Sequence, residues 1–122
     1  MEIVQLPPLK FVEGYPFEWT LTWSDEATGN PVDFTETVDG VGWSASFTIA
    51  KSLSAVPDYT AAPVLNDVGE IYISMAASDF TFLEPPDRIG GDVVAVFQIV
   101  VTAPIPQMSQ VFQGNVMIAG II

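Results

Sequence analysis

The amino-acid sequence predicts an all-β protein, a single antiparallel β-sandwich of about seven strands. Short segments in which large apolar residues alternate with polar ones recur along the chain, as in strands with one buried face. Clusters of Gly, Pro, Asn and Asp separate these segments at fairly regular intervals, as turns do. The longest apolar run, Val93–Val101, is rich in β-branched residues and ends before Pro104, so we expect it to form the central strand.

The composition is that of one globular domain, which we assign to residues 1–122. A chain of 122 residues that is 49% hydrophobic can bury a core of its own and is too apolar to be disordered. The formal net charge of −12 arises because 15 acids face only three cations, Lys10, Lys51 and Arg88. Such a chain repels phosphate groups, so we expect no nucleic-acid partner.

Two residue types are missing from the chain, and their absence narrows the chemistry. Without cysteine there are no disulfides or thiolate ligands, and without histidine the usual zinc ligand and the usual base of a serine triad are lacking. The N-terminus carries Glu2 and Pro7-Pro8 where a signal peptide would be basic and then apolar. The longest apolar run is about half the length of a membrane-spanning helix. We therefore expect a soluble protein made in the cytoplasm, with no cofactor and no membrane partner.

The first strands are predicted from alternation and from the residues that end them. Leu9–Val12 follows Pro7-Pro8 and is expected at a sheet edge, where proline is tolerated. A strand with one wet face follows, and a turn over Asp25–Pro31 ends it. The residues of that strand expected to face inward are Phe17, Trp19, Leu21 and Trp23.

The middle of the chain alternates between clear strands and weaker segments. Val32–Gly42 is polar and is expected to be a loop or a weak edge strand. A second clear strand follows, with Trp43, Ala45, Phe47 and Ile49 facing inward. Ala50–Ala62 is predicted as a connection, with a short extended piece reaching Val64-Leu65.

The C-terminal half begins with a hairpin turn over Asn66–Gly69, before a strand with Ile71, Ile73 and Met75 inward. Ser78 is expected to cap one helical turn that runs to Leu83. The central strand and a proline-stiffened loop follow, and a last strand over Val111–Ile118 places Phe112, Val116 and Ile118 inward. This order of elements is typical of an immunoglobulin-like or jelly-roll-like sandwich.

Polar clusters in the sequence do not match known catalytic or metal-binding motifs. Five acids lie close together in sequence but lack the alternating acids, central glycine and final glutamate of a calcium loop, so we expect a solvated loop and no metal site. Two carboxylates could serve a glycosidase, yet nothing selects a pair, and we expect no catalytic residues. The five acids are Asp25, Glu26, Asp33, Glu36 and Asp39.

Two apolar features instead suggest protein–protein contacts. Ile105 and Met108 lie in a loop stiffened by Pro104 and Pro106, where exposed apolar residues often mark a contact. The second face of the central strand is also apolar and needs a cover, which is either a loop or helical turn of the same chain or another subunit. We therefore predict an interaction site made by Val94, Val96, Val100, Ile105 and Met108.

Several segments together resemble the β-sandwich domains of tailed-bacteriophage virion proteins, in particular the N-terminal domains of baseplate upper proteins and tail-fibre proteins. The resemblance spans nearly the whole chain. It is carried by Gly14-Tyr15-Pro16-Phe17, Gly29-Asn30-Pro31-Val32-Asp33, Gly69-Glu70-Ile71-Tyr72-Ile73, Val96-Phe97-Gln98-Ile99 and Phe112-Gln113-Gly114-Asn115-Val116.

The resemblance implies a structural component of a tailed-phage virion, made in the host cytoplasm and assembled with other virion proteins and with copies of itself. Its place would be in the tail, the baseplate or the fibre attachment. Because such domains usually precede a stalk or receptor-binding part, a capsid decoration or cement protein is an alternative for a chain of this length. An immunoglobulin-like recognition module and, less favoured, a carboxylate-dependent enzyme are further alternatives.

Overall fold

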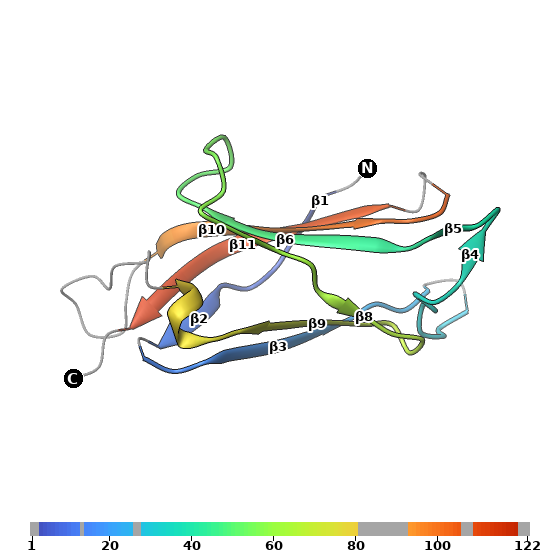
Figure 1. The fold of residues 1–122 in the computed structure, drawn as a ribbon, viewed down its shortest axis with the longest axis horizontal. Helices are drawn as coiled ribbons and strands as arrows, with labels where there is room; N and C mark the ends of the chain where they lie inside the picture. Colours follow the sequence, from blue (N-terminus) through green and yellow to red (C-terminus); the bar gives the residue numbers. More distant parts are fainter. Residues whose placement is uncertain (1–2, 13, 26–27, 81–92, 106–108, 120–122) are drawn as a thin grey trace.

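The computed structural model describes residues 3–12, 14–25, 28–80, 93–105 and 109–119. This part of the chain forms eleven β-strands and one short 3₁₀ helix, with no α-helix among the described residues (Figure 1). The prediction of an all-β protein is thus confirmed. The strands belong to three sheets. The expected single sandwich of about seven strands therefore gave too few strands and did not include the third sheet.

The largest sheet contains six strands and has β10 at its centre. β6 and β11 both pair with β10 in antiparallel fashion, which confirms the central position expected for the apolar run. The sheet has the order β1-β11-β10-β6-β7, with β2 also paired to β11. Its strands are β1 (Ile3–Gln5), β2 (Leu9–Val12), β6 (Ser44–Ala50), β7 (Tyr59–Ala61), β10 (Val93–Thr102) and β11 (Gln110–Ala119).

The N-terminal segment is one extended stretch that a proline pair divides into β1 and β2. Pro7-Pro8 cannot donate backbone hydrogen bonds, and the Leu6 N–H just before them donates to the Gln113 carbonyl at 2.8 Å. Both strands run parallel to β11, so the prediction of a purely antiparallel sheet was wrong here. β1 and β2 run in the same direction along β11, and the chain turns only after β2, at Gly14 (φ 83°), where it crosses to the other sheet.

A three-stranded sheet lies across from the larger one, and the two form the layers visible in Figure 1. Its order is β3-β9-β8, and all its pairs are antiparallel. The predicted hairpin turn at Asn66–Gly69 joins β8 to β9 and is confirmed. The three strands are β3 (Phe17–Thr22), β8 (Val64–Leu65) and β9 (Glu70–Met75).

The core fills the space between these two layers. Phe47, Phe97 and Phe112 are buried as predicted, whereas Trp19, Trp23 and Trp43 are only partly buried and pack against the core. Gly114 faces the Phe97 ring, and a Cβ there would lie 2.7 Å from a ring carbon. The other residues predicted to face inward and found buried are Ile49, Ile71, Ile73, Met75, Val116 and Ile118.

Two weaker segments differ from the prediction. The polar stretch before Trp43 contains a small hairpin of its own, β4 (Thr37–Val38) and β5 (Val41–Gly42), which is the third sheet. A 3₁₀ helix, η1, spans Ala77–Phe80, so Ser78 lies inside it and is not its cap. Asp79 also lies inside η1, and its carboxylate accepts the Ala76 N–H at 2.9 Å, which is the reciprocal bond of a capping box at the start of the helix. The predicted continuation to Leu83 lies outside the described residues.

Candidate functional site

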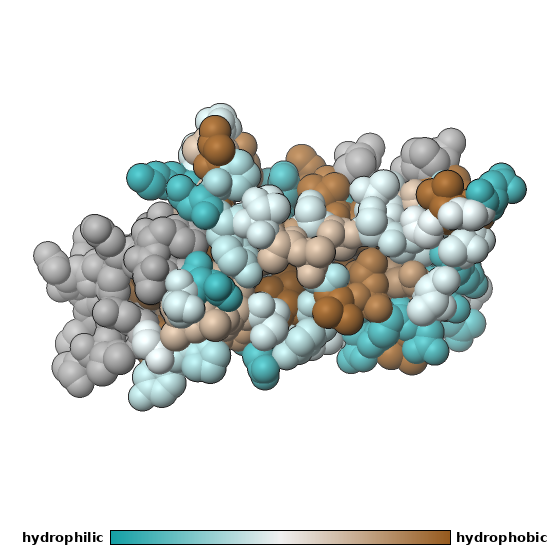
Figure 2. All heavy atoms as spheres, in the orientation of Figure 1, coloured by the Kyte–Doolittle hydropathy of each residue, from teal (hydrophilic) through white to brown (hydrophobic). Residues whose placement is uncertain are grey.

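Three connections between strands lie at one end of the molecule, the right end in Figure 1. They are the β3–β6 connection, which contains the β4–β5 hairpin, the β8–β9 turn and the β10–β11 connection. Each exposes apolar side chains, and Figure 2 shows apolar residues among polar ones at this end. We call this surface the loop end and define it by Val38 (41% exposed), Val41 (55%), Val68 (48%) and Ile105 (43%).

The β4–β5 hairpin holds two of these side chains next to each other. Asp39 (φ 51°) and Gly40 (φ 80°) form its tip, and positive φ at both tip residues matches the tight turn that favours a two-residue hairpin. Val38 and Val41 lie directly opposite each other in the pair. Because opposite residues in an antiparallel pair point to the same face, these two valines form one apolar contact surface.

The β8–β9 turn is held by the side chain of Asn66. Its Oδ1 accepts the N–H of Val68 at 3.1 Å and of Glu70 at 3.0 Å, and its Nδ2 donates to the Glu70 carboxylate at 2.8 Å. The Asn66 carbonyl also accepts the Phe34 N–H at 3.1 Å, which joins this turn to the β3–β6 connection. Val68 is therefore presented from a turn with little freedom to move.

The β10–β11 connection is closed at its base by Ser109. The Ala103 N–H donates to the Ser109 Oγ at 3.0 Å, and this hydroxyl belongs to a buried residue. Ile105, predicted to contact a partner, is exposed beyond that bond. Met108, predicted to act with it, lies outside the described residues.

An aromatic cluster underlies the loop end. The Trp23 ring packs against Phe34, Trp43 and Phe112 with centroid separations of 6.0, 5.8 and 5.9 Å, and Phe34 lies 5.1 Å from Trp43. Phe34 and Phe112 are buried, Trp23 and Trp43 are partly buried, and edge-to-face aromatic pairs of this kind add stability beyond the area that they bury. Phe34 was missed because it stands alone in a polar stretch without alternation, and only its size could have indicated burial.

The acidic residues of the same connection do not converge on a common point. Among the described residues no group of three or more potential ligands could hold a metal ion, and Glu26 lies outside them. Asp33 instead accepts hydrogen bonds from the hydroxyl and the N–H of Thr35, and these bonds lower the pKa of its carboxyl. The acid cluster in the sequence therefore orders a turn at Asp33.

The outer face of β10 carries the other predicted contact residues. Val96 and Val100 are partly exposed, while nothing is described of the Val94 side chain beyond its place in β10. Val96 shares a recess of about 60 Å³ with Leu53 of the β6–β7 connection, so a loop of the same chain lies beside it. Gln98 separates the two valines, with Thr48 and Gln113 opposite it on the neighbouring strands. This face is thus a mixed surface instead of a continuous apolar stripe.

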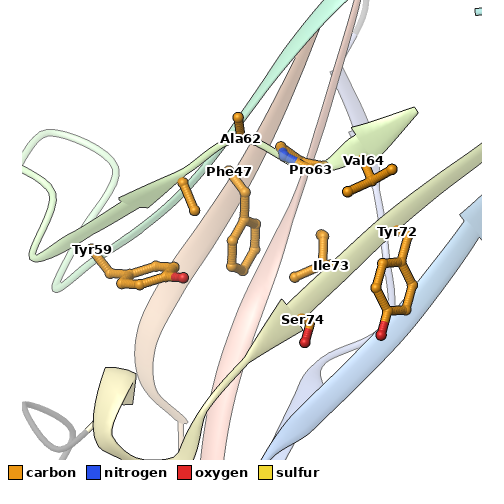
Figure 3. Close-up of a pocket in the computed structure, with 9 residues that line it drawn as sticks. Phe47, Tyr59, Ala62, Pro63, Val64, Tyr72, Ile73 and Ser74 are labelled. Carbon is orange, nitrogen blue, oxygen red and sulfur yellow. The ribbon is translucent and has the colours of Figure 1, made fainter.

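A further recess lies between the layers where the chain crosses from β7 to β8 (Figure 3). It measures about 100 Å³ and is lined by aromatic and aliphatic side chains, among them Phe47, Tyr59, Pro63 and Tyr72. Burial, and secondarily the negative charge of Asp79, raises the pKa of Tyr59. The recess shows that the two layers do not pack completely against each other at this edge of the core.

The sequence matches no protein-family model and no curated protein. Within the described residues, none of the helical structure is long and apolar enough to cross a membrane. The functional argument therefore depends on the geometry of the loop end and on the sequence resemblance given above.

Proposed function

We propose that this chain is a structural component of a tailed-phage virion that assembles through protein–protein contacts at its loop end. One observation carries the proposal. Three separate connections bring four exposed apolar side chains to one end of the molecule, above a packed aromatic cluster. Apolar residues held in place lose little entropy on binding, and exposed apolar patches commonly mark contact sites.

We also infer that the two larger sheets form an immunoglobulin-like sandwich. In the standard nomenclature the N-terminal segment is strand A, β3 is B, β6 is C and β7 is C′. The remaining strands are D (β8), E (β9), F (β10) and G (β11). The sheets then read A-G-F-C-C′ and B-E-D, with C′ added to the G-F-C sheet as in variable-type domains. In variable-type domains the B–C and F–G loops lie at the end that serves for recognition, and the corresponding connections of this chain lie at the loop end, which supports a binding role for it.

The assignment to a virion is supported by the sequence resemblance. Two of the segments that carry the resemblance contain a glycine with positive φ, Gly29 (φ 74°) and Gly69 (φ 75°). Glycine adopts this conformation without strain, so both segments form tight turns in this chain. Attachment in the tail, baseplate or fibre is the leading placement, and capsid decoration is the alternative. The clustering of loops at one end also favours an immunoglobulin-like recognition module as a second candidate.

The test is a double variant, Val41→Asp with Ile105→Asp, in the phage that encodes the chain. Its matched control is Val56→Asp, which changes a residue 87% exposed in the β6–β7 connection, away from the loop end. Quantitative mass spectrometry of gradient-purified particles should find wild type and control incorporated and the double variant reduced at least tenfold. Both variants should keep the wild-type melting temperature in purified form.

Two results would overturn the proposal: absence of the wild-type chain from purified particles, or equal incorporation of the double variant. Separate analysis of heads and tails distinguishes the placements, because a decoration protein would follow the heads. A chain that is absent from particles but binds a host-surface ligand through the loop end would support the recognition module.

A further inference from the structure

β3 is the edge strand of the three-stranded sheet and, among the described residues, pairs along one side only. The sheet order is β3-β9-β8, and no described strand pairs with the other side of β3. In immunoglobulin constant-type domains strand A lies next to strand B. Here the N-terminal segment pairs with β11 of the other sheet instead, which leaves the position beside β3 open.

The side chains of β3 show the consequence of that opening. Phe17, Trp19 and Leu21 point toward the core but are only partly buried. Their direct partners on β9 in the register, Met75, Ile73 and Ile71, are 1%, 3% and 0% exposed. An added strand beside β3 would cover the exposed parts of these three side chains.

The backbone of β3 offers a regular row of hydrogen-bonding groups to such a strand. The Trp23 N–H donates to the Gly69 carbonyl at 2.8 Å, which continues the β3–β9 register. Antiparallel strands alternate the direction of their backbone groups. Odd-numbered residues therefore bond to β9, and the N–H and C=O groups of Glu18, Thr20 and Thr22 face the open side.

We propose that the open side of β3 pairs with β3 of a second copy of this chain, antiparallel and about a two-fold axis at Thr20. In this register Thr20 lies opposite its own copy, and Glu18 lies opposite Thr22. All outward backbone groups of these three residues are then paired within the bounds of β3. If the second copy were moved by two residues toward the N-terminus of β3, Pro16 would lie opposite Thr22, and Pro16 has no N–H to donate.

The side chains fit this register on both faces. On the inner face Trp19 lies opposite Leu21, so large apolar groups cover each other. On the outer face threonines meet at the axis, a favourable cross-strand pair. Glu18, the one acid of β3, has its carboxylate bound by the Tyr72 hydroxyl of β9 at 2.9 Å, which holds the charge away from the open side.

The net charge of −12 on each copy opposes this pairing at low ionic strength. Salt screens exposed charges over about 8 Å at 0.15 M. Association of two copies should therefore strengthen as salt is added. Pairing of β3 with a basic strand of another protein would weaken as salt is added, so the salt dependence distinguishes the two.

A cysteine placed on the proposed axis tests the register, because the chain contains no cysteine of its own. Hydrogen-bonded antiparallel residues have Cα atoms about 5.5 Å apart, within reach of a disulfide. Thr20→Cys should therefore become a covalent dimer on mild oxidation. Thr22→Cys is the matched control, on the same strand and face, with its copy about 14 Å away. It should cross-link at least tenfold more slowly.

Sedimentation velocity without cross-linking gives an independent measurement. The wild type and Thr20→Val should shift toward dimer as concentration and salt rise, whereas Thr20→Pro should stay monomeric because it removes the N–H at the axis. Thr20→Pro should still melt cooperatively, since that N–H does not bond to β9. A wild type that stays monomeric at every concentration and salt, or equal cross-linking of the two cysteine variants, would overturn the proposal. Neither result depends on the loop end.

Discussion

β3 and β9 lie side by side in one sheet, and both alternate apolar and polar residues, yet only β9 has its inward side chains fully buried. Ile71 and Ile73 of β9 are almost inaccessible, while Trp19 and Leu21 of β3 remain partly exposed. β9 pairs with β3 along one side and, at Tyr72 and Ile71, with β8 along the other, whereas no described strand pairs with the second side of β3. Alternation in the sequence thus determines which face a side chain occupies, and the neighbouring strands determine how deeply it is buried.

The largest effect expected from this difference is a loss of stability on truncating β9. Ile73→Ala should lower the free energy of unfolding by about 3–4 kcal/mol, since a fully buried side chain leaves a cavity. Leu21→Ala, on β3, should cost about half as much because water already reaches part of that side chain. Urea unfolding at low protein concentration measures both variants. Equal losses would mean that β3 is as well covered as β9.

A second effect concerns the point where β3 and β9 meet. Gly69 has φ 75°, and a Cβ there would lie 2.4 Å from the Trp23 carbonyl oxygen. Gly69→Ala should therefore lower the free energy of unfolding by about 2–3 kcal/mol, from left-handed strain together with the clash. Gly29→Ala is the control, because Gly29 has φ 74° but open space around its Cβ.

Gly29→Ala should cost about 1 kcal/mol from backbone strain alone. Thermal melting of the two variants gives the comparison directly. If they melted at the same temperature, close packing at the end of β3 would not contribute to stability.

The smallest effect is expected on the outer face of the same two strands. Tyr72→Phe removes the hydrogen bond from the Tyr72 hydroxyl to the Glu18 carboxylate, which is exposed to solvent. The free energy of unfolding should change by less than about 0.5 kcal/mol, because water replaces an exposed partner at little cost. Calorimetry should find a melting temperature within about 2 °C of wild type. A loss above about 1.5 kcal/mol would show that this bond fastens β3 to β9.

The residues themselves determined the strands and their inward faces. Successive side chains of a strand point to opposite faces, so Ile71, Ile73 and Met75 could be placed in the core from their spacing alone. The β-branched run of β10 likewise indicated a strand between two neighbours. The turn at Gly69 was predictable because positive φ favours glycine locally. All of these are properties of a few adjacent residues.

Only the tertiary structure decided which segments meet. The pairing of β2 with β11, the burial of Phe34 in a polar stretch and the placing of three connections at one end of the molecule all involve segments far apart in sequence. The open side of β3 likewise depends on where the N-terminal segment pairs. Such contacts depend on the packing of the whole chain, because a strand's own residues specify its faces but not its neighbours.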